Sequence, residues 1–145
     1  MYFVDRQMIE TTLDFLDRQI SFFEGQQKWD TLLEKAALER LAHTIIEAVL
    51  DAGNAMIDGF IMRDPGSYED IVEILTDEKV VTPELGSSLK KLIQFRKSLV
   101  QMYTEVDHQA LIQAFTDELA LLKQFSPKVR SYLTNELGPV SAFKQ

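Results

Sequence analysis

The chain has 145 residues, of which 46% are hydrophobic and 26% are charged, and its formal net charge is −8. This length and composition are typical of one globular domain with a sizeable core. The absence of cysteine excludes disulfides, zinc–thiolate centres and thiol catalysis. A cysteine-free chain without a signal-peptide pattern also indicates a cytoplasmic protein.

The apolar runs are much shorter than a membrane span, and we expect no membrane partner. An acidic protein repels nucleic acid at long range, so we expect no DNA partner either. Contact with RNA would need a local basic cleft or a basic partner. No glycine-rich nucleotide loop is present, and we expect no cofactor.

Glycine and proline are scarce, and the apolar residues between them recur at alternating spacings of three and four, which predicts helices. The first helix is expected over 5–23, and the second from an N-cap at Asp30 to Met62. Ser67 and Asp70 form a variant capping box for a short third helix. In the second helix, small residues form a stripe that allows another segment to approach closely: Ala48, Ala52, Ala55 and Gly59.

Thr82-Pro83 predicts the N-cap and first-turn proline of a helix that continues to Val106. Asp107 can cap a further helix that carries apolar residues up to Phe125, and Ser126-Pro127 begins a last short helix. Short loops favour antiparallel packing of these neighbours. We therefore predict an all-α antiparallel bundle of four to five main helices as a single domain over 1–138, followed by a tail over 139–145.

One arginine interrupts an apolar stripe in the helix predicted over 83–106. Arg96 shares this stripe with Leu85, Leu89, Leu92, Leu99 and Tyr103, at spacings of four, three, four, three and four. A buried guanidinium needs a carboxylate, carbonyl oxygens or an open cleft, so Arg96 is either a paired structural residue or part of a site.

The second helix carries a polar stripe that can supply a partner for Arg96. We hypothesise that Glu47, Asp51 or Asn54 neutralises the guanidinium. The stripe also admits two other interpretations, a solvated face or a metal site. The absence of the paired Glu-x-x-His motifs of di-iron bundles argues against the metal site. Its members are His43, Glu47, Asp51, Asn54 and Asp58.

The segment from Arg96 to Tyr103 resembles a motif of the HepT-like branch of the HEPN superfamily, a family of small all-helical bacterial proteins. That motif is an arginine followed five positions on by histidine and seven on by tyrosine. The resemblance covers most of the chain and includes 51–57 and the turn over 63–68. By position, Arg96 matches the arginine and Tyr103 the tyrosine, whereas Gln101 occupies the histidine position and Lys97 replaces a polar residue.

The resemblance implies a homodimer with the motif helices near the dimer cleft. It implies metal-independent RNA cleavage of the kind found in toxins of HepT/MntA-type toxin–antitoxin systems. It also implies an antitoxin partner, a minimal nucleotidyltransferase that can adenylylate the motif tyrosine. The expected roles are phosphate contact for Arg96, substrate contact or modification for Tyr103, and substrate contact for Lys97, Asn54, Glu47 and Asp51.

Gln101 weakens the expectation of RNA cleavage, because it replaces the histidine of the motif. Cleaving RNA without a metal uses the 2′-hydroxyl as nucleophile, and a base must take its proton. Histidine titrates near neutral pH, whereas glutamine exchanges no proton there, and losing such a group typically costs about 10²- to 10⁴-fold in rate. Three hypotheses therefore remain: a ribonuclease with a weakened motif, an inactive dimer that binds RNA, a nucleotide or a protein, or a purely structural helical dimer with an inert cleft. We interpret His43 as a helix-face residue and His108 as a solvated loop residue.

Overall fold

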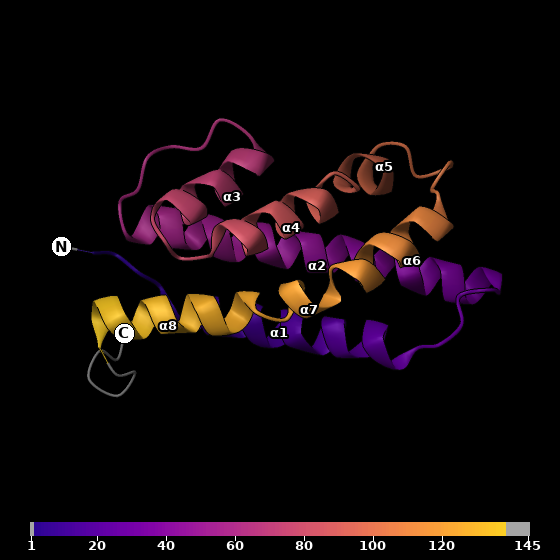
Figure 1. Ribbon diagram of the computed structural model, residues 1–145, viewed down its shortest axis with the longest axis horizontal. Coiled ribbons are helices and arrows are strands. Elements are labelled where there is room, and N and C mark those ends of the chain that lie inside the picture. Colours follow the sequence, from indigo (N-terminus) through magenta and orange to yellow (C-terminus); the bar gives the residue numbers. More distant parts are fainter. Residues whose placement is uncertain (1, 139–145) are drawn as a thin grey trace.

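The computed structural model describes residues 2–138, and every regular element within them is a helix. The two longest helices, α1 (Arg6–Gly25) and α2 (Leu32–Gly59), form an antiparallel hairpin on which the shorter helices pack (Figure 1). The all-α bundle predicted from the sequence is confirmed, and the tail expected over 139–145 lies outside the described residues. None of the described helices combines the length and the apolarity that crossing a bilayer requires.

The shorter helices cover the hairpin from two sides. The pair α3 (Tyr68–Asp77) and α4 (Pro83–Ile93) packs over α2, and α8 (Phe125–Leu137) lies along α1 (Figure 1). Buried apolar side chains from both sides meet in one core, in which Phe115 and Phe125 are fully buried.

Capping residues explain where the hairpin helices begin. The Asp5 carboxylate accepts a hydrogen bond from the Met8 N–H at 3.0 Å and starts α1. The second helix begins after Thr31 rather than Asp30, because Thr31 and Glu34 form a complete capping box. The Glu34 carboxylate accepts from the N–H groups of Thr31 and Asp30 at 2.9 and 3.0 Å, and these bonds lower the pKa of Glu34.

The second helix ends at Gly59 instead of the predicted Met62. Ile61 adopts a φ of 55°, a left-handed conformation that a helix does not continue through. The Phe3 N–H donates to the Gly59 carbonyl at 2.9 Å, and a Cβ added at Gly59 would lie 2.9 Å from Val4 Cγ2. The small-residue stripe therefore admits the N-terminal segment at this end of α2.

The prediction of one helix from 83 to 106 is wrong in its second half. The chain turns after Ile93, forms α5 (Arg96–Val100) and then a turn over 101–105. The Phe95 N–H donates to the Leu92 carbonyl at 3.1 Å, a three-residue spacing that tightens the helix. The Ser98 hydroxyl donates to the Phe95 carbonyl at 3.0 Å and competes with the helical ladder.

The helix predicted over 107–125 is also divided. Asp107 caps α6 (His108–Asp117) as predicted, by accepting from the Ala110 N–H at 3.0 Å, and a single turn, α7 (Leu119–Leu122), follows. The last helix begins at Phe125, one residue before the predicted start. The Ser126 hydroxyl does not cap it and instead donates to Asp17 at 2.7 Å, joining α8 to α1.

Candidate functional site

Arg96 is the first residue of α5, and its side chain reaches α2. Nε and Nη2 donate to Oε2 and Oε1 of Glu47 at 3.0 and 3.1 Å. The two side chains are 21% and 33% exposed, so the pair lies at the protein surface and not in the core. The structure thus places Glu47, one of the three residues we expected, as the partner that neutralises Arg96.

The ion pair fixes the charge state of its members. The Arg96 guanidinium lowers the pKa of Glu47, and the carboxylate in turn raises the pKa of Arg96. One helical turn further along α2, partial burial and the negative charge of Glu47 raise the pKa of Asp51. Glu47 therefore stays ionised to lower pH than an ordinary glutamate, and Asp51 takes up a proton more readily than an ordinary aspartate.

Tyr68 completes the surroundings of the guanidinium, and the sequence analysis missed this role. The Arg96 Cζ lies 4.2 Å from the centroid of the Tyr68 ring, which is cation–π geometry. Tyr68 is 49% exposed at the start of α3, and its periodicity had indicated only an apolar position in a short helix. The one available signal was its place at the end of the turn that matched the family.

That turn is held rigidly at the start of α3. Arg63 donates to both carboxylate oxygens of Asp70 at 2.8 and 2.9 Å, and the Gly66 N–H donates to the same carboxylate at 2.8 Å. Arg63 and the Gly66 N–H together lower the pKa of Asp70 to about 2. The Ser67 hydroxyl caps the helix by accepting from the Asp70 N–H at 3.1 Å. These contacts fix the backbone from which the Tyr68 ring projects.

The pairing with Glu47 leaves one edge of Arg96 available. A guanidinium has five N–H donors, and Glu47 takes the Nε–H and one Nη2–H. No described residue accepts a hydrogen bond from Nη1. The edge formed by Nη1 and the second Nη2–H can therefore receive the two oxygens of a phosphate in a bidentate contact.

The expectation that Arg96 and Tyr103 share one face of a continuous helix is wrong. Because the helix ends at Val100, Tyr103 lies in the following turn with its side chain 66% exposed. Gln101 lies in the same turn and is exposed, as is Lys97 on α5. The motif residues therefore occupy one short surface segment, with Arg96 as its anchored member.

Two other expected contacts have different outcomes on α2. Asp51 is near enough to Arg96 to contribute to its pKa, whereas Asn54 is exposed and makes no side-chain hydrogen bond with another described residue. Within residues 2–138, no three His, Asp or Glu side chains are grouped so that they could hold a metal ion.

Both histidines contact glutamates of α2: His43 lies on that helix, and His108 reaches it from α6. His43 Nε2 lies 3.6 Å from Glu47 Oε1, and His43 is a half-buried helix-face residue, as we interpreted it. The interpretation of His108 as a solvated loop residue is wrong. It is the first residue of α6, its side chain is 22% exposed, and its Nε2 lies 2.7 Å from Oε2 of Glu39.

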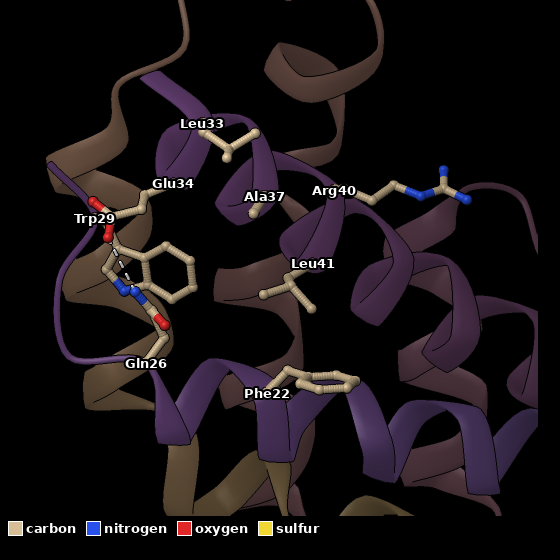
Figure 2. A pocket seen from close by; sticks show the side chains of 8 residues that line it. All are labelled: Phe22, Gln26, Trp29, Leu33, Glu34, Ala37, Arg40 and Leu41. Atoms are coloured by element: carbon tan, nitrogen blue, oxygen red, sulfur yellow. Dashed lines mark hydrogen bonds between the residues drawn. The ribbon is translucent and has the colours of Figure 1, made fainter. Parts of the chain in front are cut away.

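Two hollows follow the α1–α2 hairpin. One, of about 420 Å³, reaches the Arg96 pair because Glu47 and Asp51 form part of its wall, together with Phe15, Arg18 and Arg40. The other, of about 480 Å³, lies near the loop between the helices, where Phe22 of α1 faces Leu41 of α2 and Arg40 points away (Figure 2). The second hollow contains none of the expected site residues, whereas Glu47 and Asp51 line the first.

Comparison with known proteins assigns this chain to one class of protein. A family model described as "Ribonuclease HepT-like" matches residues 8–129, and the chain belongs to this HepT-like ribonuclease family. It is 54% identical over 144 residues to a Bacillus subtilis (strain 168) protein named "Putative RNase YutE", with 99% of this chain and 100% of that protein covered.

Solved structures support the same assignment. The structure of YutE from Bacillus subtilis, described as a cytosolic protein of unknown function, has a TM-score of 0.95 and 53% identity, with 99% of this chain and 100% of that chain covered. Two toxin–antitoxin crystal structures share the fold at 18% identity, one with AMP-PNP (TM-score 0.78) and one a tyrosine-to-alanine mutant of MntA–HpeT (0.75). Each covers 87% of this chain and 99% of its own.

Proposed function

We propose that the protein is an endoribonuclease that cleaves RNA without a metal ion, in a cleft between two copies of the chain. Membership of the HepT-like ribonuclease family supports the class of reaction. The observation that carries the proposal for this chain is the free edge of Arg96, held at the surface by Glu47 and Tyr68. A preorganised guanidinium of this kind stabilises the negative charge that develops on a phosphate during cleavage.

The surrounding residues take supporting roles in this proposal. Glu47 and the Tyr68 ring fix the guanidinium before substrate arrives, so little ordering is required at the moment of reaction. Lys97 and Tyr103 lie on the exposed surface beside Arg96 in the chain and contact the substrate. The overall charge of −8 makes such local donors necessary, because the rest of the surface repels RNA.

Gln101 favours a second candidate function. Its amide can donate and accept hydrogen bonds, but it cannot take the 2′-hydroxyl proton near neutral pH. A dimer that binds RNA, a nucleotide or a protein without cleaving it would need the Arg96 edge and would not need a histidine at position 101. Cleavage assays separate the two functions directly.

The proposed partner is a minimal nucleotidyltransferase that acts as antitoxin. The support is that toxin–antitoxin structures share this fold. The 66% exposure of Tyr103 leaves its hydroxyl accessible to an adenylylating enzyme. Co-expression with a candidate partner and ATP should add one AMP to the peptide containing Tyr103, and the Tyr103→Phe variant should remain unmodified in the same mass-spectrometric assay.

The test of the main proposal is RNA cleavage by purified protein in excess chelator. We expect the wild type to cleave and Arg96→Ala to lose about 10²- to 10³-fold in rate, the usual cost of removing a charge-stabilising donor. Gln101→His should cleave faster than the wild type. Equal rates for wild type and Arg96→Ala would reject the site, and light scattering should give the mass of a dimer.

A further inference from the structure

A histidine of α2 lies beside the Arg96 pair. His43 Nε2 is 3.6 Å from Oε1 of Glu47, the same oxygen that accepts from Nη2 of Arg96 at 3.1 Å. The two nitrogens are therefore no more than 6.7 Å apart, the sum of 3.1 and 3.6 Å. The His43 side chain is 29% exposed and that of Arg96 is 21% exposed, so both reach the surface at one place.

The stretch from Arg96 to His108, which comprises α5 and the turn after it, is attached to α2 at both of its ends, one turn on either side of His43. At one end Arg96 binds Glu47, and at the other His108 binds Glu39. His43 follows Glu39 by four residues and precedes Glu47 by four, so all three lie on the same face of α2. The two residues that flank the stretch over 97–107 therefore bind α2 on the face that carries His43.

This segment contains Gln101, which stands where the family motif has histidine. The position that lacks an imidazole thus lies in a stretch whose two flanking residues, Arg96 and His108, bind the helix face that has one. The Nε2 of His43 lies 3.6 Å from Oε1 of Glu47, an ion-pair distance that is longer than a hydrogen bond. His108 differs, since its 2.7 Å contact with Glu39 engages the corresponding nitrogen.

We propose that His43 is the proton-transfer residue of the site and supplies from α2 the imidazole that position 101 lacks. The proposal rests on the proposed ribonuclease function. Imidazole changes its charge between pH 5 and 8, which suits it to this step near neutral pH. The charged groups near it are Glu39, Arg40 and Glu47 on its own helix and Arg96 from α5, and His108 from α6 binds Glu39.

The step can be written in full. Unprotonated Nε2 of His43 takes the proton of the 2′-hydroxyl as the 2′-oxygen bonds to phosphorus, and Arg96 binds the phosphate oxygens. The bond from phosphorus to the 5′-oxygen breaks, and that oxygen takes a proton from solvent. His43 then returns its proton to solvent, which leaves a 2′,3′-cyclic phosphate and a 5′-hydroxyl end.

Other titratable groups at the site are less suited to this role. Both oxygens of Glu47 are occupied by Arg96. Asp51 lies four residues beyond Glu47 and is the remaining carboxyl near the guanidinium. It is therefore the competitor that an experiment must include.

The chain has two histidines, so each provides a matched control for the other. Cleavage of a single-stranded RNA is measured from pH 5 to 9 in excess chelator for wild type, His43→Gln, His108→Gln and Asp51→Asn. We expect His43→Gln to lose about 10²- to 10⁴-fold in rate, together with the rise in rate between pH 5 and 8. His108→Gln should keep the wild-type shape of the pH profile, even if loosening α6 lowers its rate.

A second measurement separates proton transfer from folding. Added imidazole should restore cleavage to His43→Ala and not to Arg96→Ala, an effect that a merely structural histidine does not show. Cleavage by His43→Gln within about threefold of the wild type, or loss of the pH-dependent rise only in Asp51→Asn, would overturn the role of His43 and leave the proposed function standing. Absence of cleavage by the wild type would overturn both.

Discussion

Arg96 and Arg130 each join two helices at the protein surface, yet their environments differ. Arg130 of α8 donates from Nε to Glu10, from Nη2 to Asp14 and from Nη1 to Asp17, at 2.9, 2.9 and 3.2 Å. All three nitrogens are therefore occupied by carboxylates of α1. In Arg96 one carboxylate occupies two nitrogens, and a ring covers one face of the guanidinium.

The difference shows how the same side chain serves structure in one place and ligand binding in another. Neither residue is deeply buried, since the side chain of Arg96 is 21% exposed and that of Arg130 is 33% exposed. An arginine surrounded by three carboxylates has excess negative charge around it, which repels an anion. An arginine with one carboxylate and one free edge is held in position and still able to bind phosphate. The number of carboxylates, more than burial, distinguishes the two.

Replacing each arginine by lysine should give the largest contrast. Lysine keeps the charge but cannot present a planar edge with two donors. We expect Arg96→Lys to lower the rate of RNA cleavage about 100-fold, the equivalent of about 2.7 kcal/mol. Arg130→Lys should cleave RNA at the wild-type rate in the same assay. A similar loss in both variants would contradict the distinction between the two sites.

For stability, the order of the two arginines should be reversed. Removing the charge of Arg130 should lower the free energy of unfolding more than removing that of Arg96. Arg130→Ala leaves three carboxylates of α1 close together, and we expect it to lower the free energy of unfolding by about 1–2 kcal/mol. Arg96→Ala leaves one carboxylate and should cost less. Urea unfolding measures the loss in unfolding free energy for both alanine variants. Raising the salt concentration should reduce the difference between the two losses, because these groups are partly exposed.

The Arg96–Glu47 pair should contribute to stability in acid. Because the folded-state pKa of Glu47 lies below its unfolded value, its contribution is present above the unfolded pKa and is lost as pH falls through the folded pKa. We expect Glu47→Gln to be less stable than the wild type at pH 7, by up to about 1 kcal/mol. The two proteins should converge in urea unfolding below about pH 4. A constant difference down to pH 2 would show that the pair contributes no pH-dependent stability.

The smallest effect is expected for the ring beneath Arg96. An exposed cation–π contact contributes about 0.5–1 kcal/mol. Tyr68→Leu should therefore weaken binding of a non-cleavable 2′-O-methyl RNA by about two- to fivefold in a fluorescence titration. Tyr68→Phe keeps the ring and should bind like the wild type. Loss in the phenylalanine variant as well would assign the effect to the hydroxyl rather than to stacking.

The helices of the hairpin could be predicted from sequence because their signals are local and agree with one another. The apolar stripe of α1 recurs at helical spacing, and its members are buried: Ile9, Leu13, Leu16, Ile20 and Phe23. Asp107 and Thr82 cap helices where expected, since a cap depends on hydrogen bonds three residues away. The break after Ile93 could not be predicted in this way, because apolar spacing continues through it.

The candidate site was predicted in part. The cost of burying an unpaired arginine pointed to a partner on the second helix, and Glu47 is that partner. Tyr68 was missed because nothing in its helical position distinguishes a ring that faces Arg96 from a ring in the core. Tyr103 was placed wrongly because the prediction extended a helix that Ser98 and the tight turn at Phe95 interrupt.

The sequence by itself determined the helical class, most helix starts and the presence of one arginine that needed a partner, because periodicity, capping and desolvation act locally or on one residue. Only the tertiary structure decided which carboxylate that arginine meets, which of its edges stays free and which histidine lies beside it. These depend on side chains 49 residues apart, such as Arg96 and Glu47, and no local pattern specifies such a distance.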